Sequence, residues 1–148
     1  MNSINKNISR LSLHDSHLEN LERKSDLTIA TFDWGYLGDF SESGYEKGIV
    51  IGKCRLLISG IKDEEFRVYR EGTKYDIEKT PEDINKCWDE IANTGIDENH
   101  KQIILDGMFT RGSDSNWIEW KFNYDSVKLE WNSFVTHKEW EDGKLPED

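Results

Sequence analysis

Four consecutive polar residues near the start of the chain have the side chains that metal sites and acid–base sites use. His14, Asp15, Ser16 and His17 place two imidazoles, a carboxylate and a hydroxyl just before the first recognisable strand. Two imidazoles and one carboxylate are ligands that zinc accepts, but a second segment must complete the coordination. On a strand, His14 and His17 would also point to opposite faces. Zinc binding is therefore the less favoured of two interpretations.

The favoured interpretation is a structural turn. Asp15 or Ser16 can cap a turn that leads into the first strand, and His14 can form a hydrogen bond across the sheet. His100 and His137 are the other two imidazoles, and neither lies at ligand spacing within a cluster. We predict a structural turn, with no metal and no cofactor, and keep a site near His14 and Asp15 as the alternative.

Nucleophilic catalysis lacks its usual signal in this sequence. The chain contains no Gly-x-Ser-x-Gly segment, which would present a serine nucleophile on a sharp strand-to-helix turn. Carboxylates are plentiful, but acid–base catalysis needs two of them held at a set separation in a cleft. We predict that the protein is not an enzyme.

A segment rich in glycine, serine and acidic residues runs from Gly35 to Gly48. This composition predicts a long, exposed loop. Partly exposed aromatic rings are favoured anchors in protein interfaces, and carboxylates around them speed association with a basic partner. The predicted binding residues in this loop are Tyr36, Asp39, Phe40, Glu42, Tyr45 and Glu46.

Charge and composition narrow the classes of partner. The 148 residues include 30 acidic and 19 basic side chains, which gives a formal net charge of -11 at pH 7. This charge repels nucleic-acid phosphates and anionic membranes, so we expect neither as a partner, and it suits a basic protein. The polar segment 1–10 lacks a signal-peptide core and no apolar run could span a bilayer, so we expect a cytoplasmic protein. The oligomeric state stays open.

The pattern of apolar residues predicts a mostly β protein. Alternating or β-branched runs predict strands over 18–23, 27–34, 49–61, 66–70, 103–110, 117–124 and 127–131. Gly52 predicts a bulge or bend within the third of these, and 62–65 a turn after it. The last two runs alternate most clearly and are separated by Asp125-Ser126, which predicts a hairpin with one buried face.

A single helix is expected after Thr80. Thr80 can cap it, Pro81 suits its first position, and Ile84, Cys87, Trp88 and Ile91 recur at helical spacing, while Gly95 can end it near position 94. The predicted fold is a single domain over 1–148, α+β but mostly β. It is an antiparallel sheet or a partly open barrel of about seven strands with one packed helix. Residues 1–12 and 139–148 are expected to fray, and the apolar surroundings of Cys54 and Cys87 predict two buried thiols.

The start of the chain also resembles a known group. The run Leu13-His14-Asp15-Ser16-His17-Leu18, with Leu21 and the segment 27–33, resembles a small bacterial group in which an HDS tripeptide precedes a hairpin. That group includes the Bacillus YxiG-like family and immunity proteins of polymorphic toxin systems. The resemblance covers roughly the first quarter of the chain, and its matched motif positions are His14, Asp15 and Ser16. It implies a cytosolic, non-enzymatic protein that binds and silences a toxin domain.

Overall fold

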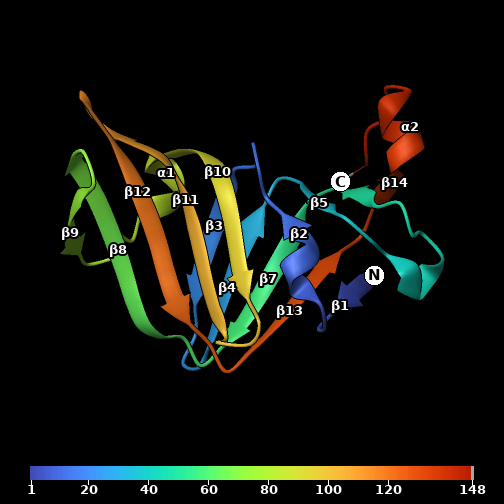
Figure 1. Ribbon diagram of the computed structural model, residues 1–148, viewed down its shortest axis with the longest axis horizontal. Coiled ribbons are helices and arrows are strands. Elements are labelled where there is room, and N and C mark those ends of the chain that lie inside the picture. The colour runs from blue at the N-terminus through green and yellow to red at the C-terminus, as the bar shows by residue number, and fades with distance from the viewer. Residues whose placement is uncertain (148) are drawn as a thin grey trace.

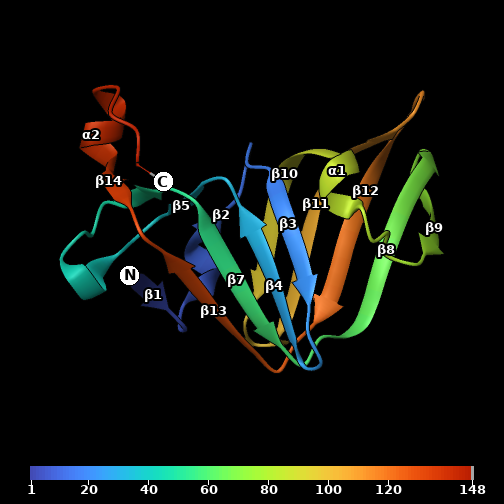
Figure 2. The same ribbon diagram turned by 180° about the vertical axis from the view of Figure 1, so that it is seen from behind.

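The computed structural model describes residues 1–147 and is built almost entirely from antiparallel strands. Strands hold 58% of the residues and helices 10%, which confirms the predicted mostly β class. Two five-stranded sheets face each other, and a smaller four-stranded sheet lies at one end (Figure 1). We call them the front, back and end sheets, because the front sheet is nearest the viewer in Figure 1 and the back sheet is nearest in Figure 2.

The front sheet has the strand order β10-β11-β12-β8-β9. Its strands are β8 (Lys62–Glu71), β9 (Lys74–Glu78), β10 (Trp88–Asp97), β11 (Gln102–Arg111) and β12 (Asp114–Asn123). Alternation along β12 buries Ile118, Trp120 and Phe122 completely. Since side chains alternate across a strand, the intervening residues of β12 lie on the outer face of this sheet.

The back sheet has the order β1-β13-β7-β4-β3. Its strands are β1 (Asn2–Ile4), β3 (Leu18–Arg23), β4 (Leu27–Phe32), β7 (Cys54–Ser59) and β13 (Ser126–Trp131). The end sheet, β14-β6-β5-β2, consists of β2 (Leu11–Ser12), β5 (Gly35–Leu37), β6 (Ile49–Ile51) and β14 (Phe134–Thr136). Four short helical segments complete the fold: η1 (Ile8–Arg10), η2 (Ser41–Ser43), α1 (Ile84–Cys87) and α2 (His137–Glu141).

The core lies between the front and back sheets and is rich in large rings. Trp120 packs against Phe122 with ring centroids 4.9 Å apart. Trp88 packs edge-on against Trp120, with 6.4 Å between their ring centroids. Leu129 and Trp131 of the back sheet belong to the same buried cluster. Each large apolar side chain taken from water contributes roughly 1.5–3 kcal/mol, so a few rings stabilise a chain of only moderate apolar content.

The predicted hairpin between the runs 117–124 and 127–131 is wrong, although both strands and their buried faces are present. β12 pairs with β11 and β8, whereas β13 pairs with β7 and β1. The chain passes from the front sheet to the back sheet at Tyr124 and Asp125, whose amides donate to the carbonyls of Lys101 and Ser59. The apolar faces of β12 and β13 therefore belong to opposite walls of the core.

The predicted helix from Thr80 to about position 94 is also wrong. Only Ile84–Cys87 is helical, and β10 begins at Trp88. The register slips between Trp88 and Glu90 and again between Ile91 and Asn93, so that Trp88 and Ile91 pair with Phe109 and Gly107. A β-bulge of this kind places residues three apart on the same face, which reproduces helical spacing inside a strand.

Three further expectations differ from the structure. The run 49–61 does bend at Gly52, but there it divides into β6 of the end sheet and β7 of the back sheet. Residues 62–65, predicted as a turn, begin β8, and about fourteen strands replace the expected seven within residues 1–147.

The ends of the chain are also built into the fold. Ile4, Ile8 and Leu11 within 1–12 are buried, and β1 pairs with β13. At the other end, a capping box formed by Thr136 and Glu139 holds α2, while Asp148 lies outside the described residues. Cys54 is buried and Cys87 is half-buried, and both are free thiols. Burial raises the pKa of the Cys54 thiol to about 12.

Candidate functional site

The segment from His14 to His17 lies between β2 and β3 and follows the edge of β10. The Asp15 amide donates to the Ile91 carbonyl at 2.8 Å, and the Ile91 amide donates to the Ser16 carbonyl at 2.9 Å. Asp15 has a φ of 66°, and its carbonyl accepts a hydrogen bond from the Trp34 indole at 3.3 Å. The segment is a turn that extends the pairing of β10, but backbone contacts form it. Within residues 1–147 neither the Asp15 carboxylate nor the Ser16 hydroxyl supplies the predicted cap, since the hydroxyl has no partner and the carboxylate lies 3.4 Å from His14 Nε2.

The two imidazoles of this segment have separate partners. His14 Nδ1 lies 2.6 Å from the Ala92 carbonyl, so this nitrogen is the donor, because a carbonyl oxygen only accepts. His17 Nδ1 lies 2.9 Å from an Asp33 carboxylate oxygen. Within residues 1–147 there is no group of three or more His, Cys, Asp or Glu side chains placed to hold a metal ion. The hydroxyl of Ser16 is completely buried and has no hydrogen-bond partner in this part of the chain.

The rings of the segment 35–48 are packed rather than displayed. Phe40 is only 4% exposed. The centroid of its ring lies 5.1 Å from that of Trp131 and 5.9 Å from that of Phe134. Tyr45 pairs with Phe40 through a β-bridge, and its ring packs against that of Phe134 with centroids 5.2 Å apart. The expectation of a long exposed loop is therefore wrong for these residues, since Phe40 has no surface to offer a partner.

The acids of the same segment have mixed roles. Glu42 forms a bidentate ion pair with Arg10, in which one N–O distance is 2.8 Å. Asp39 accepts a hydrogen bond from the Ser41 amide at 2.6 Å. The Arg10 guanidinium lowers the pKa of Glu42 to about 2 by hydrogen bonding to it. Glu46 is exposed. Arg10 thus ties the segment to η1, and little of its negative charge stays free for a partner.

Tyr36 is the remaining predicted anchor. It is half-buried, its ring meets that of His137 edge-on at 6.1 Å, and its hydroxyl lies 3.5 Å from the Lys47 carbonyl. Of the six predicted binding residues, Glu42 and Glu46 are exposed, and of these two Glu42 is paired with Arg10.

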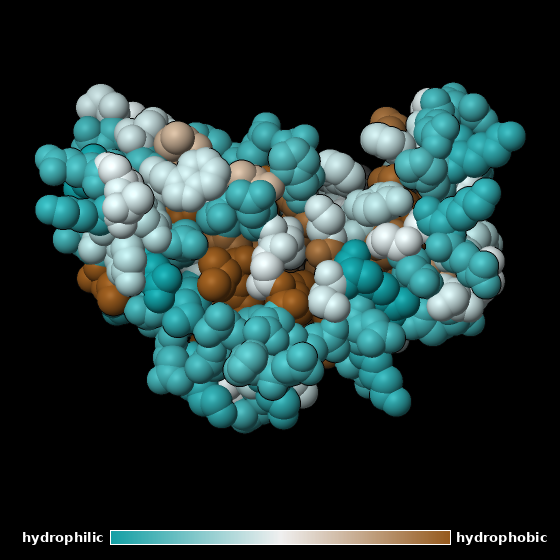
Figure 3. Space-filling model, in the orientation of Figure 1, coloured by the Kyte–Doolittle hydropathy of each residue, from teal (hydrophilic) through white to brown (hydrophobic). Residues whose placement is uncertain are grey.

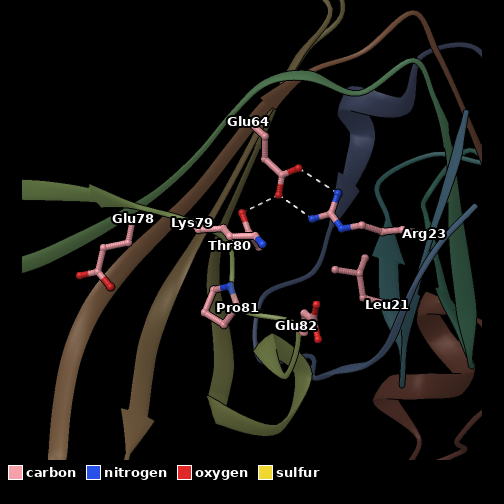
Figure 4. A pocket seen from close by; sticks show the side chains of 8 residues that line it. All are labelled: Leu21, Arg23, Glu64, Glu78, Lys79, Thr80, Pro81 and Glu82. Atoms are coloured by element: carbon pink, nitrogen blue, oxygen red, sulfur yellow. Dashed lines mark hydrogen bonds and ion pairs between the residues drawn. The ribbon is translucent and has the colours of Figure 1, made fainter. Parts of the chain in front are cut away.

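A pocket of about 630 Å³ opens between β3 of the back sheet and β8 of the front sheet (Figure 4). Glu64 is one of its lining residues and accepts hydrogen bonds from Arg23, from the Thr80 hydroxyl and from the Trp120 indole at 2.9 Å. Burial by itself would raise the pKa of Glu64, but these donors outweigh it and the net shift is downward. The carboxylate therefore joins two sheets and the segment before α1, and both of its oxygens already accept hydrogen bonds.

A second pocket, of about 460 Å³, lies beside the His14–His17 turn. Its lining residues come from that turn, from β10 and from the outer face of β11 and β12. They are His14, Asp15, His17, Asp89, Glu90, Ile91, Ala92, Met108 and Trp117. We call this cavity the acidic pocket, because three of its side chains are carboxylates and, among residues 1–147, no Lys or Arg lines it.

A row of large side chains leads from the acidic pocket across the outer face of the front sheet. Met108 pairs with Trp117, Trp117 with Tyr69, and Tyr69 with Tyr75, so the four side chains are in register on four adjacent strands. Met108, Trp117 and Tyr75 are 40%, 37% and 42% exposed, and Ile77 beside them is 57% exposed. We call these five residues the aromatic row. In Figure 3, apolar and intermediate surface gathers over β8, β12 and β11 among hydrophilic side chains.

Polar contacts hold the rings of the aromatic row in place. The Tyr69 hydroxyl donates a hydrogen bond to Glu119, and the Tyr69 and Tyr75 rings lie 5.2 Å apart. The Arg67 guanidinium lies over the Tyr75 ring, 4.8 Å from its centroid. Burial, and then the hydrogen bond to Glu119, raises the pKa of Tyr69 to about 12. These neighbours limit the motion of the rings, which lowers the entropy cost of using them in an interface.

Sequence reasoning missed this surface, although a signal for it was present. Trp117 and Tyr69 lie at positions of the alternating pattern that are expected to face water, whereas the residues between those positions are apolar. A large ring at a position expected to face water is the observation that could have identified the row, but only pairing of the strands shows that the rings line up.

No protein-family model matches the chain, and no curated protein or solved structure matches it either. Among residues 1–147, no helix is both long and apolar enough to cross a membrane.

Proposed function

We propose that this chain is a non-catalytic, acidic binding protein of the cytoplasm that acts as an immunity-type inhibitor of a basic protein partner. The aromatic row is the observation that supports this function best. Trp and Tyr dominate the energetic centres of protein interfaces, and here they form a continuous strip on a sheet face. The acidic pocket at the end of the strip and the net charge of -11 favour a partner of opposite charge.

The outer face of the front sheet suits this role because it is rigid and already arranged. β11 and β12 pair along their whole length without a register shift, and the buried faces of the strands of this sheet form one wall of the core. A partner therefore meets rings whose positions are set by the sheet. Arg67, Glu119 and Lys121 alternate in sign around the rings, as expected for a polar rim.

The alternative function, binding of a small ligand or catalysis near His14 and Asp15, is favoured by one observation, the cavity beside that turn. Metal analysis of the purified protein distinguishes the two proposals. Stoichiometric zinc would support the alternative and contradict the structural role of the histidines.

A co-expression and pull-down experiment tests the proposed function. The products of the neighbouring genes, basic ones first, are co-expressed with the wild type and with the double variant Trp117→Ala/Tyr75→Ala. We expect the wild type to retain a basic partner and to rescue growth if that partner is toxic, and the variant to fail in both.

Trp140→Ala is the matched control, because Trp140 is 43% exposed but lies on α2, away from the row. Capture should also weaken at raised salt, because salt screens attraction between exposed charges. Retention of no basic protein by the wild type, or equal losses in the two tryptophan variants, would contradict the proposal.

A further inference from the structure

We infer that the acidic pocket receives an arginine side chain of the partner, and this inference rests on the proposed function. The pocket lies where the aromatic row meets the turn from His14 to His17. Its walls combine carboxylates with an exposed indole and an exposed thioether, which together match the two ends of an arginine side chain.

The carboxylates come from two segments that the fold brings together. Asp15 belongs to the turn before β3, and Asp89 and Glu90 belong to the bulge at the start of β10. Because the register slips there, Glu90 lies opposite Met108 at the head of the row. A regular strand would place Asp89 and Glu90 on opposite faces, so the bulge is what lets both line one pocket.

The apolar wall comes from Met108 and Trp117, which are paired in register on β11 and β12. Both side chains are more than a third exposed, so a ligand can cover them. A guanidinium is planar and weakly hydrated, and it stacks on an indole while its N–H groups bind carboxylates. The methylene stem of arginine would meanwhile lie on the thioether of Met108.

Glu90 carries the open charge of the pocket. No Lys or Arg of residues 1–147 lines this pocket. Asp15 lies 3.4 Å from His14 Nε2, and Asp89 accepts a hydrogen bond from the Thr110 hydroxyl at 2.7 Å. Within residues 1–147 the Glu90 carboxylate has no hydrogen bond or ion pair, so it is the group left for a cation. The pocket at Glu64 differs, because Arg23 neutralises that carboxylate directly. Of the two cavities, only the acidic pocket therefore offers open negative charge beside an exposed ring.

Small probes test the assignment without the partner. Nitrogen-15-labelled full-length protein is titrated with Nα-acetyl-arginine amide, with the lysine analogue, and with the citrulline analogue, which has the shape of arginine but no charge. We expect saturable shifts of the Trp117 indole and of the amides of 89–92 with the arginine probe. The lysine probe should bind more weakly and the citrulline probe about tenfold more weakly, the size of one lost charged contact.

Two matched variants locate the effect. Glu90→Gln should weaken arginine binding about tenfold, whereas Glu71→Gln, an exposed acid of β8 in the same sheet, should leave it unchanged. Equal binding of arginine and citrulline, equal binding of arginine and lysine, or equal losses in both variants would overturn the assignment. Thermal unfolding of each variant confirms that it is folded.

The outcomes separate this inference from the proposed function. If the arginine probe does not bind while Trp117→Ala abolishes capture of a basic partner, the proposed function stands and the pocket assignment is wrong. If no partner is captured while the probe binds with these dependences, the pocket assignment stands and the proposed function is wrong.

Discussion

The segment from Gly35 to Gly48 and the outer face of the front sheet both combine aromatic rings with carboxylates, yet they use them differently. In the segment, Phe40 is buried against Trp131, and Glu42 is paired with Arg10. On the front sheet, Trp117 and Tyr75 are exposed to solvent. Glu90 lines a pocket whose lining, within residues 1–147, includes no Lys or Arg. The comparison teaches that composition alone does not separate a binding surface from a packed loop, because the partners of each side chain decide its role.

The largest effect is expected from removing the ring that the segment buries. Phe40→Ala should lower the free energy of unfolding by about 3–5 kcal/mol, because it leaves a cavity beside Trp131 and Phe134. Denaturant unfolding followed by tryptophan fluorescence measures this loss. A change below about 1 kcal/mol would mean that the segment is not packed as described, and would restore it as a candidate binding loop.

The second effect concerns the bulge that forms one wall of the acidic pocket. A Cβ atom on Gly107 would lie 2.2 Å from the Glu90 carbonyl oxygen and 2.6 Å from the Trp88 indole nitrogen. Gly107→Ala should therefore destabilise the protein by about 1–3 kcal/mol, as overpacking of backbone does. It should also shift the amide resonances of 88–92. Gly112→Ala is the matched exchange, because nothing lies near that position, although its φ of 62° adds some strain of its own.

A smaller, pH-dependent effect is expected in the segment from Gly35 to Gly48. The pKa of Glu42 is about 2 in the folded protein against 4.5 ordinarily, so its carboxylate stabilises the fold above pH 4.5. That contribution is lost as the pH falls from 4.5 towards 2. Glu42→Gln should cost about 0.2–1 kcal/mol at neutral pH, the range for exposed ion pairs, and this cost should disappear as the pH falls through about 2.

Urea unfolding of this variant at several pH values gives the measurement. Glu46→Gln is the matched control, because it changes an exposed acid of the same segment that is not paired with Arg10. Parallel curves for Glu42→Gln and the wild type across the whole range would show that the ion pair with Arg10 contributes nothing to stability.

The smallest effect on stability is expected on the aromatic row. Ile77 is 57% exposed, so Ile77→Ser should change the free energy of unfolding by less than about 0.5 kcal/mol. The same variant should weaken capture of the basic partner, since Ile77 lies beside Tyr75 in the row. A large loss of stability with intact capture would reverse the comparison, making the row a structural element.

Much of the fold could be predicted from local patterns. The strands over 18–23, 103–110 and 127–131 have nearly the bounds that alternation indicated, and Ile118, Trp120 and Phe122 are buried together as expected. Periodicity succeeds at this level because it reports which side chains of one strand face the same way.

The failures share a physical cause as well. The spacing of Ile84, Trp88 and Ile91 predicted a helix, but a bulged strand puts Trp88 and Ile91 on one face too. In the candidate site, the turn at His14–His17 could be anticipated from its residue types, whereas the acidic pocket could not. Its lining comes from four elements that only strand pairing brings together.

The amino-acid sequence by itself determined the mostly β class, the acidic charge and the buried face of most strands. Those properties depend on neighbours along the chain and on composition. The tertiary structure alone decided that β12 and β13 face each other across a core and that Phe40 is buried. It likewise decided that Met108, Trp117, Tyr69 and Tyr75 form one row. These outcomes depend on which strands pair and in which register, and such long-range choices are made by packing across the molecule rather than by any local run of residues.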